Sequence, residues 1–268
     1  MRRTFYFVCC ALLFCCMCGA WAVIIWFEIA AAPDPTLPIL LPVLAACCML
    51  LRLDSLVHES GHFLFGLLAG LKPRRVAFGW VSFGEGGVRF GRRSAAGETR
   101  FSLKKPQEAH AKLIAATVGG PFLGIVFGVV MLALYFVLPM HPALTFFTFF
   151  AIWCLAEALM ELLPAELPAG KTDGLVLKEL IKRTGETEIA VRVMQAQLLL
   201  QNRPAGTLPR ELLFDVPVVR EDSPAFIELL KLQADFLHEH GDGEGEAAVR
   251  VRLQAIMDEG EGAPGKTA

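Results

Sequence analysis

The sequence predicts a mainly α-helical, polytopic membrane protein with about four transmembrane helices, a membrane-proximal β-hairpin and a small all-helical cytoplasmic tail. Of its 268 residues, 54% are hydrophobic, whereas soluble domains average about 45–50% apolar residues. The excess lies in residues 5–70 and 109–163, and the rest of the chain has an ordinary composition. A motif of two histidines and a glutamate lies inside one apolar segment. These observations divide the chain into a membrane domain, residues 1–174, and a helical tail, residues 175–268.

Charge and cysteine content exclude several classes of protein. The formal net charge of −2 argues neither for nor against nucleic-acid binding. No basic patch interleaved with aromatic residues occurs outside one loop, so we expect no nucleic-acid partner. The eight cysteines all lie in apolar segments, which argues against a disulfide framework or a zinc ribbon. We expect them to be small buried hydrophobic residues.

Residues 5–29 form the first predicted transmembrane helix. This apolar run has about the 20 residues that cross a bilayer, and Arg2 and Arg3 precede it. A signal peptide has the same charged start, but its apolar core is shorter, about 7–15 residues. We therefore expect a retained span whose amino terminus is cytoplasmic, because positive charge favours that side. The external turn that follows is marked by Pro33, Asp34, Pro35 and Pro38.

The second apolar segment, residues 37–71, is too long for one straight span. Arg52 and Asp54 interrupt its middle. Asp54 precedes His58 by one helical turn, so in a helix both side chains share one face. Two interpretations of Asp54 are open: it bonds His58, or it neutralises Arg52.

The same segment contains HESGH at residues 58–62, which matches H-E-x-x-H. In a helix, His58 and His62 have side chains about 6 Å apart on one face and can bind one metal ion. Zinc is the expected ion, because neutral imidazoles suit it and a catalytic site keeps one position open for water. Glu59 points to the adjacent flank, where it can accept a proton from that water. The pattern also arises by chance, but such residues are costly in lipid and usually have a function there.

Residues 72–112 are predicted to lie on the cytoplasmic side, because cationic residues dominate them. The cations are Lys72, Arg74, Arg75, Arg89, Arg92, Arg93, Arg100, Lys104, Lys105 and Lys112. Residues 76–91 alternate apolar and small residues around Gly84, Gly86 and Gly87, which predicts a β-hairpin, and residues 99–103 predict a further strand. The hairpin would offer an edge to an extended substrate. A basic loop that contacts anionic lipid headgroups is the equally supported alternative.

Two further spans are predicted, at residues 109–138 and 144–163. The first contains Gly-Gly-Pro at residues 119–121, and small residues allow helices to pack closely in lipid. The second carries Glu157 and Glu161, one helical turn apart. Carboxylates inside a span require an explanation, and we expect these to face either the active-site cavity or the arginine of the second segment.

Residues 164–174 contain two prolines and two glycines, which break the last span at the inner membrane face. Asp173 lies in this break and is the expected third zinc ligand, which completes a set of two histidines and one carboxylate. Helix capping is the competing explanation, because Asp is a favoured N-cap and residues 175–181 have a helical pattern. Glu157 and Glu161 remain alternative third ligands.

Three motifs resemble, in their order, those of the site-2 protease family of intramembrane zinc metalloproteases. They are HESGH at residues 58–62, GGP at residues 119–121, and Pro164 followed by Asp173 and Gly174. The resemblance covers residues 40–180 and no more of the chain.

The resemblance implies that His58, His62 and Asp173 bind zinc and that Glu59 is the catalytic base. Two features depart from the family. Members of the family usually have Asn three residues before the proline, and this chain has Glu161 at that position, before Pro164. The gap between Pro164 and Asp173 is also longer than is common in the family. These departures concern substrate handling more than zinc binding.

The tail is predicted to be all-helical. Helical apolar spacing covers residues 175–182 and 188–200, a proline-broken connector covers residues 203–217, and residues 225–240 and 246–257 form a helix pair. The pair has the size of one tetratricopeptide-like hairpin. We expect it to offer a surface for a protein partner or to cover the active site from the cytoplasm.

With the resemblance, these motifs imply an intramembrane zinc metalloendopeptidase with one zinc ion per chain. We expect a multi-pass protein of the cell membrane, with both termini cytoplasmic, that hydrolyses a membrane protein substrate within or next to a transmembrane segment. The alternative is a catalytically altered scaffold of the same fold that binds partners through its tail, and Glu161 is its main support. A third hypothesis is a membrane-anchored zinc protease that cuts soluble chains at the cytoplasmic face.

Overall fold

The computed structural model describes residues 3–31, 36–50, 53–78, 81–84, 87–90, 98–139, 141–167, 170–201, 203–217 and 219–261. Several residues named above lie outside the described residues: Arg2, Pro33, Asp34, Pro35, Arg52, Gly86, Arg92 and Arg93. The chain divides into two compact units, residues 1–101 with 111–178, and residues 102–110 with 179–268. Most described residues are helical, and a small sheet accompanies the helices.

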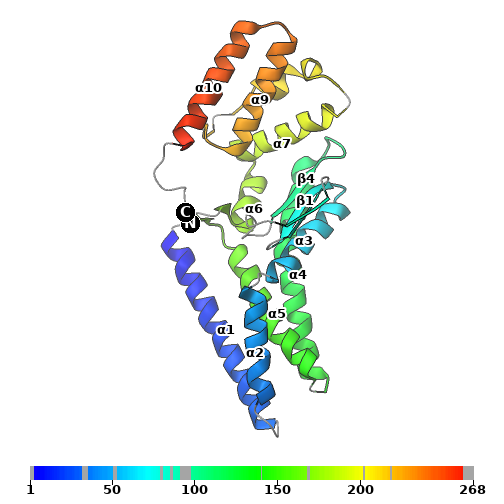
Figure 1. Cartoon of the computed structure of the whole chain (residues 1–268), viewed down its shortest axis with the longest axis vertical. Coiled ribbons are helices and arrows are strands. Elements are labelled where there is room, and N and C mark those ends of the chain that lie inside the picture. Colours follow the sequence, from blue (N-terminus) through cyan, green and yellow to red (C-terminus); the bar gives the residue numbers. More distant parts are fainter. Residues whose placement is uncertain are drawn as a thin grey trace. The chain divides into compact units, whose positions relative to one another are not determined.

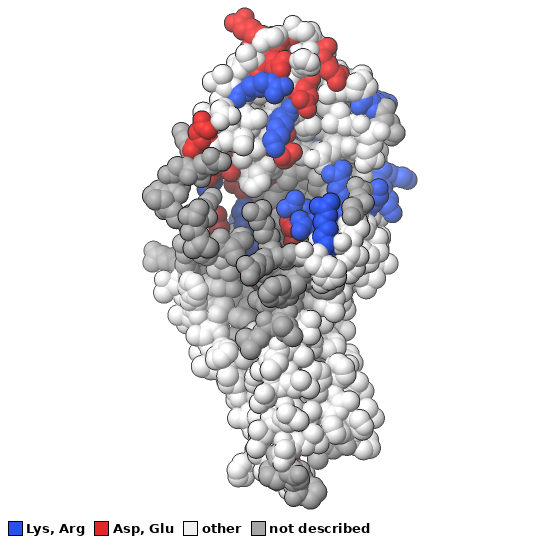
Figure 2. Space-filling model, in the orientation of Figure 1, with Lys and Arg blue, Asp and Glu red and all other residues white. Residues whose placement is uncertain are grey.

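Three helices are long and apolar enough to cross a membrane: α1 (Arg3–Ala31), α4 (Ala109–Val137) and α5 (Pro142–Glu161). They coincide with the first, third and fourth predicted spans. In the lower part of Figure 2, where this bundle lies, the described surface shows no Lys, Arg, Asp or Glu. A surface of this kind suits a hydrocarbon environment, as the composition predicted.

The second apolar segment forms two helices, α2 (Thr36–Leu50) and α3 (Asp54–Leu68). Asp54 begins α3, where its carboxylate is favourable because the N-terminal end of a helix carries partial positive charge. This carboxylate is buried and accepts a hydrogen bond from the Trp153 indole on α5, at 3.0 Å. Among the described residues it makes no hydrogen bond to His58, so that interpretation is wrong. Asp54 instead anchors the start of α3 to α5.

Polar contacts fasten α1 to the other apolar helices. The Trp21 indole donates a hydrogen bond to the Phe149 carbonyl of α5, at 3.2 Å. Glu28 is only 5% exposed and accepts hydrogen bonds from the hydroxyls of Tyr135 (2.8 Å) and Thr145 (3.2 Å). A carboxylate buried among apolar helices is tolerated when such donors satisfy it. Figure 1 shows α1, α2, α4 and α5 side by side.

Helices α3 and α4 approach each other closely at two glycines. A Cβ on Gly61 of α3 would clash with the Gly119 carbonyl of α4, and a Cβ on Gly119 would clash with the Gly61 carbonyl. Small residues are common where helices meet in a membrane, because they let the backbones approach. The contact holds the backbone of α4 against the HESGH helix.

The residues after α3 form a four-stranded sheet with strand order β3-β2-β1-β4. The strands are β1 (Lys72–Phe78), β2 (Val81–Gly84), β3 (Gly87–Phe90) and β4 (Glu98–Ser102). β2 pairs antiparallel with both β1 and β3. The sheet extends beyond the prediction, because its first strand begins at Lys72 rather than at Val76.

A two-stranded ribbon, not predicted from the sequence, leads to Asp173. β5 (Glu166–Leu167) pairs antiparallel with β6 (Gly170–Lys171). Thr172 follows and is almost fully buried. Its hydroxyl donates to the Leu163 carbonyl (2.7 Å) and accepts the Ala165 N–H (2.9 Å). These bonds fix the chain immediately before α6 (Asp173–Lys182).

The second unit is a helical domain around one apolar core. Its helices are α7 (Gly185–Leu199), η1 (Ala205–Thr207), α8 (Arg210–Phe214), α9 (Pro224–Glu239) and α10 (Gly243–Glu261). α9 packs against both α7 and α10, and the fully buried core residues include Ile189, Leu213 and Leu229. The connector predicted between the helices contains η1 and α8, two short helices that the prolines did not reveal.

Residues 102–110 belong to this second unit, although the sequence analysis assigned them to the membrane domain. The Gln195 amide of α7 donates a hydrogen bond to the Pro106 carbonyl, at 3.2 Å. Nε2 of His110 lies 3.1 Å from a carboxylate oxygen of Glu188. Side chains of α7 thus hold the segment that joins β4 to α4.

The expectation of buried cysteines is wrong for half of them. Cys15, Cys16, Cys18 and Cys47 are exposed on α1 and α2, and Cys154 is buried in α5. The apolar helices present these thiols on their outer faces, where a bilayer rather than the protein core supplies apolar surroundings.

Replacing Gly61 by Ala should lower stability, because the added methyl group clashes with backbone atoms of α4. Overpacking of this kind costs about 1–3 kcal/mol. Thermal unfolding of the detergent-solubilised protein measures the effect. Gly19→Ala in α1 is the control, because nothing lies within 4 Å of its Cβ position. Equal unfolding midpoints for the two variants would contradict the close contact of α3 with α4.

Candidate metal centre

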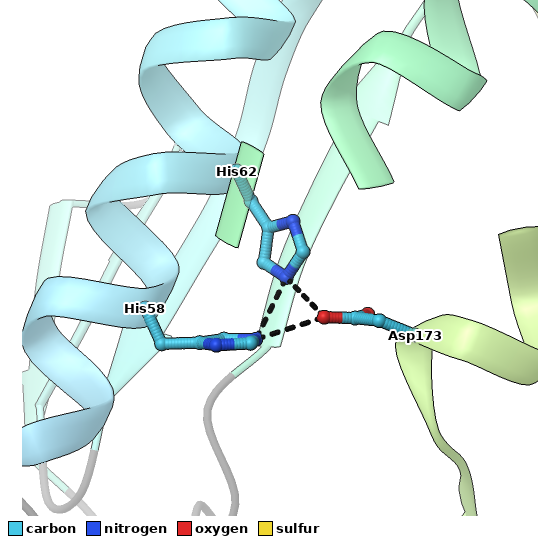
Figure 3. Close-up of side chains that lie close together, drawn as sticks. All are labelled: His58, His62 and Asp173. Atoms are coloured by element: carbon cyan, nitrogen blue, oxygen red, sulfur yellow. Dashed lines mark hydrogen bonds and ion pairs between the residues drawn. The ribbon is translucent and has the colours of Figure 1, made fainter. Parts of the chain in front are cut away.

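Two candidate ligands come from α3, one helical turn apart. His58 and His62 turn their Nε2 atoms toward the same point, and these atoms are 3.0 Å apart (Figure 3). The two rings meet edge to face, with 82° between their planes. The HESGH spacing therefore places both imidazoles on one helix face.

Asp173 brings a third donor atom from the start of α6. Its Oδ2 lies 2.9 Å from Nε2 of His58 and 3.1 Å from Nε2 of His62. Gly174 lets α6 begin against the end of α5, because a Cβ there would clash with the Leu162 carbonyl. Within the described part of the chain, these three side chains are the group placed to hold one metal ion.

The proton arrangement of His62 leaves Nε2 ready to bind a metal. Nδ1 lies 2.8 Å from the Ala116 carbonyl oxygen on α4. Because a carbonyl only accepts hydrogen bonds, Nδ1 carries a proton, and the lone pair of the neutral ring is then on Nε2. Metal-binding histidines commonly donate their other N–H to a carbonyl in this way.

The Asp173 carboxylate presents an unsatisfied oxygen to the histidines. Oδ2 is buried and makes no hydrogen bond with a described residue, although both Nε2 atoms lie within ion-pair distance. Burial by itself would raise the pKa of this carboxyl, whereas protons on His58 and His62 would lower it, to about 2. The buried oxygen is therefore unfavourable without a cation beside it, and a metal ion can be that cation when both rings are neutral.

The separations between the donor atoms suit zinc. Nitrogen and carboxylate oxygen bind zinc at about 2.0–2.2 Å, so two ligands of a tetrahedral site are roughly 3.3 Å apart. The distances of 2.9, 3.0 and 3.1 Å need to grow by only a few tenths of an ångström. Three protein ligands leave the fourth position open, which is typical of catalytic rather than structural zinc sites.

Gly120 keeps the space beside the donor atoms free. A Cβ at this position of α4 would lie 2.5 Å from Nε2 of His62 and 2.9 Å from Nε2 of His58. Any larger residue would thus fill the room that an ion needs. The GGP motif therefore serves two purposes, since Gly119 permits the helix contact and Gly120 clears the site.

Glu59 lies on the flank of α3 that adjoins the ligand face. It is 4% exposed, and its Oε2 accepts a hydrogen bond from the Thr99 hydroxyl on β4. Glu59 does not belong to the group of donor atoms that can hold the ion. Its carboxylate is therefore bound by the sheet and is not placed as a metal ligand.

Neither alternative carboxylate joins the three donor atoms. Oε2 of Glu161, at the end of α5, accepts a hydrogen bond from the Asp173 backbone N–H, at 3.4 Å. Glu157 lies one turn earlier on α5 and is also outside the group. The capping explanation of Asp173 is wrong, because α6 begins at Asp173 itself, Thr172 holds the position before the helix, and the Asp173 side chain turns to the histidines.

Three contributors to the site were missed by sequence analysis. They are the Ala116 carbonyl, the clearance at Gly120 and the Thr99 hydroxyl. The GGP motif marked the right part of α4, both as a packing motif and as one of the three motifs of the resemblance. No local pattern singles out one threonine on a strand, so Thr99 required the tertiary structure.

The purified, detergent-solubilised protein should hold about one zinc ion per chain, because three donor atoms converge on one point. His58→Ala and Asp173→Ala should each lose most of it. Glu161→Gln should keep its zinc, because this side chain bonds a backbone N–H. Elemental analysis after metal loading and dialysis measures all four proteins. Zinc that persists in Asp173→Ala but disappears in Glu161→Gln would identify Glu161 as the third ligand instead.

Gly120→Ala should weaken zinc binding by about 10–100-fold, the range typical of residues that support metal ligands. The methyl group would occupy space next to both Nε2 atoms. Competition with a zinc-binding dye measures the affinity. Gly128→Ala is the matched control on the same helix, because its Cβ would crowd Leu155, 2.8 Å away, and not the histidines. If both variants bind zinc as the wild type does, Gly120 does not keep the site clear.

No protein-family model matches the sequence, and neither a curated protein nor a solved structure matches it. Similarity therefore assigns the chain to no family. The resemblance to site-2 proteases rests on three short motifs.

Proposed function

We propose that this protein is an intramembrane zinc metalloendopeptidase, similar to site-2 proteases. The observation that carries the proposal is the convergence of three donor atoms, two imidazole nitrogens and one carboxylate oxygen, within 2.9–3.1 Å of one another. A buried glutamate, Glu59, follows the first histidine directly. The polypeptide that carries this group also contains three helices long and apolar enough to cross a membrane.

The proposed reaction is hydrolysis of a peptide bond by water. A bound zinc ion would lower the pKa of its water and polarise the substrate carbonyl. Glu59 accepts the proton of the attacking water and then delivers it to the leaving amine nitrogen. His58, His62 and Asp173 hold the ion, and the bond from His62 Nδ1 to the Ala116 carbonyl fixes the ring orientation.

The proposed topology has four spans, with α2 and the start of α3 as the second. The cationic stretch after α3 supports a cytoplasmic location for the sheet, and hence cytoplasmic termini for a chain with an even number of spans. HESGH then lies in the inner part of the second span. This placement favours cleavage within or next to a transmembrane segment over cleavage of soluble chains.

The substrate must reach the site in an extended form, because the hydrogen bonds of a helix hide its carbonyl groups. The sheet supports this requirement. β3 and β4 end the strand order, and a strand at an edge can pair with an extended segment. Phe83, Val88 and Phe90 are exposed on β2 and β3, and such apolar side chains suit contact with a membrane-derived peptide or with lipid.

A non-proteolytic scaffold is the second candidate. Its support is Glu161, which replaces the Asn usual in the family and is engaged with the Asp173 backbone. In this case the second unit would be the part that binds a protein partner. A scaffold of this kind would bind zinc without hydrolysing any peptide.

Glu59→Gln should leave only a small residual rate of cleavage and keep zinc. Loss of a general base typically lowers the rate by about 10²–10⁴-fold, whereas the amide leaves the three ligands unchanged. The assay uses the zinc-loaded protein in detergent and a fluorogenic peptide with an apolar segment of about 20 residues, interrupted centrally by Gly and Pro. Zinc content is measured on the same samples. Equal cleavage by Glu59→Gln and wild type would refute the role of Glu59, and a zinc-loaded wild type that cuts neither this peptide nor unfolded casein would favour the scaffold.

A further inference from the structure

Glu59 has a hydrogen-bond donor that comes from the sheet. The Thr99 hydroxyl on β4 donates to Oε2 of Glu59. Thr99 is forty positions later in the chain, on a strand that the ligand residues do not share. Since the hydroxyl donates its one hydrogen bond to Oε2, the carboxylate keeps lone pairs on both oxygens for other partners.

A second contact fixes the register of β4 on α3. A Cβ on Gly66 would clash with the ring of Phe101, so this ring packs directly on the helix backbone. Thr99 and Phe101 are two residues apart on β4 and therefore share one strand face. Glu59 and Gly66 are seven residues apart on α3, about two turns, and therefore share one helix face. The inward face of β4 thus lies along one face of α3, in parallel order.

This register leaves Thr99 little freedom to move away from Glu59. Phe101 cannot slide along α3 without leaving the space that Gly66 provides. On another face of α3, Gly61 abuts α4, so the helix cannot rotate away from the strand. A glutamate side chain otherwise has three rotatable bonds and samples several rotamers. Its bond to Thr99 selects one of them.

We propose that Thr99 is a positioning residue that orients Glu59 for proton transfer. The inference rests on the proposed function, because it assigns Glu59 the role of general base. Thr99 touches neither the metal ligands nor the proposed substrate bond, and it acts through Glu59. The sheet is then part of the catalytic machinery as well as a surface for substrate.

The first test needs no enzymatic activity. Thr99→Val, Glu59→Ala and the double variant form a double-mutant cycle in thermal unfolding of the full chain in detergent. Thr99→Val should lower the midpoint by a few degrees in the wild type and have almost no effect in the Glu59→Ala background. Thr148→Val is the matched control, because its buried hydroxyl donates to the Leu144 carbonyl (2.9 Å) within α5. Its shift should be the same in both backgrounds.

The second test measures catalysis with the same fluorogenic peptide. Thr99→Val should lower kcat by about 10–100-fold, since small misplacements of a catalytic group have effects of this size. KM and zinc content should stay close to wild type. Thr99→Ser keeps the hydroxyl and should restore kcat to within about threefold, whereas Thr148→Val should keep wild-type kcat.

The two tests separate failure of this inference from failure of the proposed function. Equal shifts of Thr99→Val in both backgrounds would show that Thr99 does not bond Glu59. Wild-type kcat in Thr99→Val, or no recovery in Thr99→Ser, would show that the hydroxyl does not orient the base. If the double-mutant cycle shows the expected coupling but the wild-type protein cleaves no peptide, Thr99 bonds Glu59 without serving catalysis. In that case the proposed protease function fails, and the positioning role of Thr99 fails with it.

Discussion

The close approach of α3 and α4 is the constraint on which the rest of the site depends. Gly61 and Gly119 have no side chains, and a Cβ at either position would keep the two backbones apart. The approach brings the Ala116 carbonyl to His62 Nδ1, which decides the tautomer, and Gly120 to the two Nε2 atoms. In a membrane, apolar side chains gain little by leaving lipid, so backbone proximity of this kind is a main source of helix association. The same contact therefore supplies both stability and ligand orientation.

The position of Asp173 depends on a second close approach, between the start of α6 and the end of α5. Asp173 is far from the histidines in sequence, so its position must be fixed locally. Thr172 bonds the carbonyl and N–H groups around the break, Gly174 lets α6 start against the end of α5, and the β5–β6 ribbon closes the loop between them. These contacts fix the backbone at the start of α6, and from there the Asp173 side chain extends to His58 and His62.

Elements with strong periodicity could be predicted from the sequence, and contacts between distant elements could not. The apolar runs gave the places of α1, α4 and α5, and the HESGH spacing gave two side chains on one face of α3. The partner of Asp54 was missed, because one indole among many apolar residues of α5 gives no signal. The four-stranded sheet was underestimated, because β1 starts in a cationic, proline-containing stretch that does not alternate. Thr99 is a comparable case, since its role depends on how β4 lies along α3.

The charges around the site lead to the same conclusion as its geometry. Three carboxylates, those of Glu59, Glu161 and Asp173, lie on segments that meet at the two imidazoles. The N-terminal end of α6 partly offsets them, because its N–H groups carry partial positive charge and one of them bonds Glu161. A helix end supplies only about half an elementary charge, which is less than the full negative charge of the Asp173 carboxylate alone. A divalent cation held by His58, His62 and Asp173, as proposed, would supply the missing positive charge.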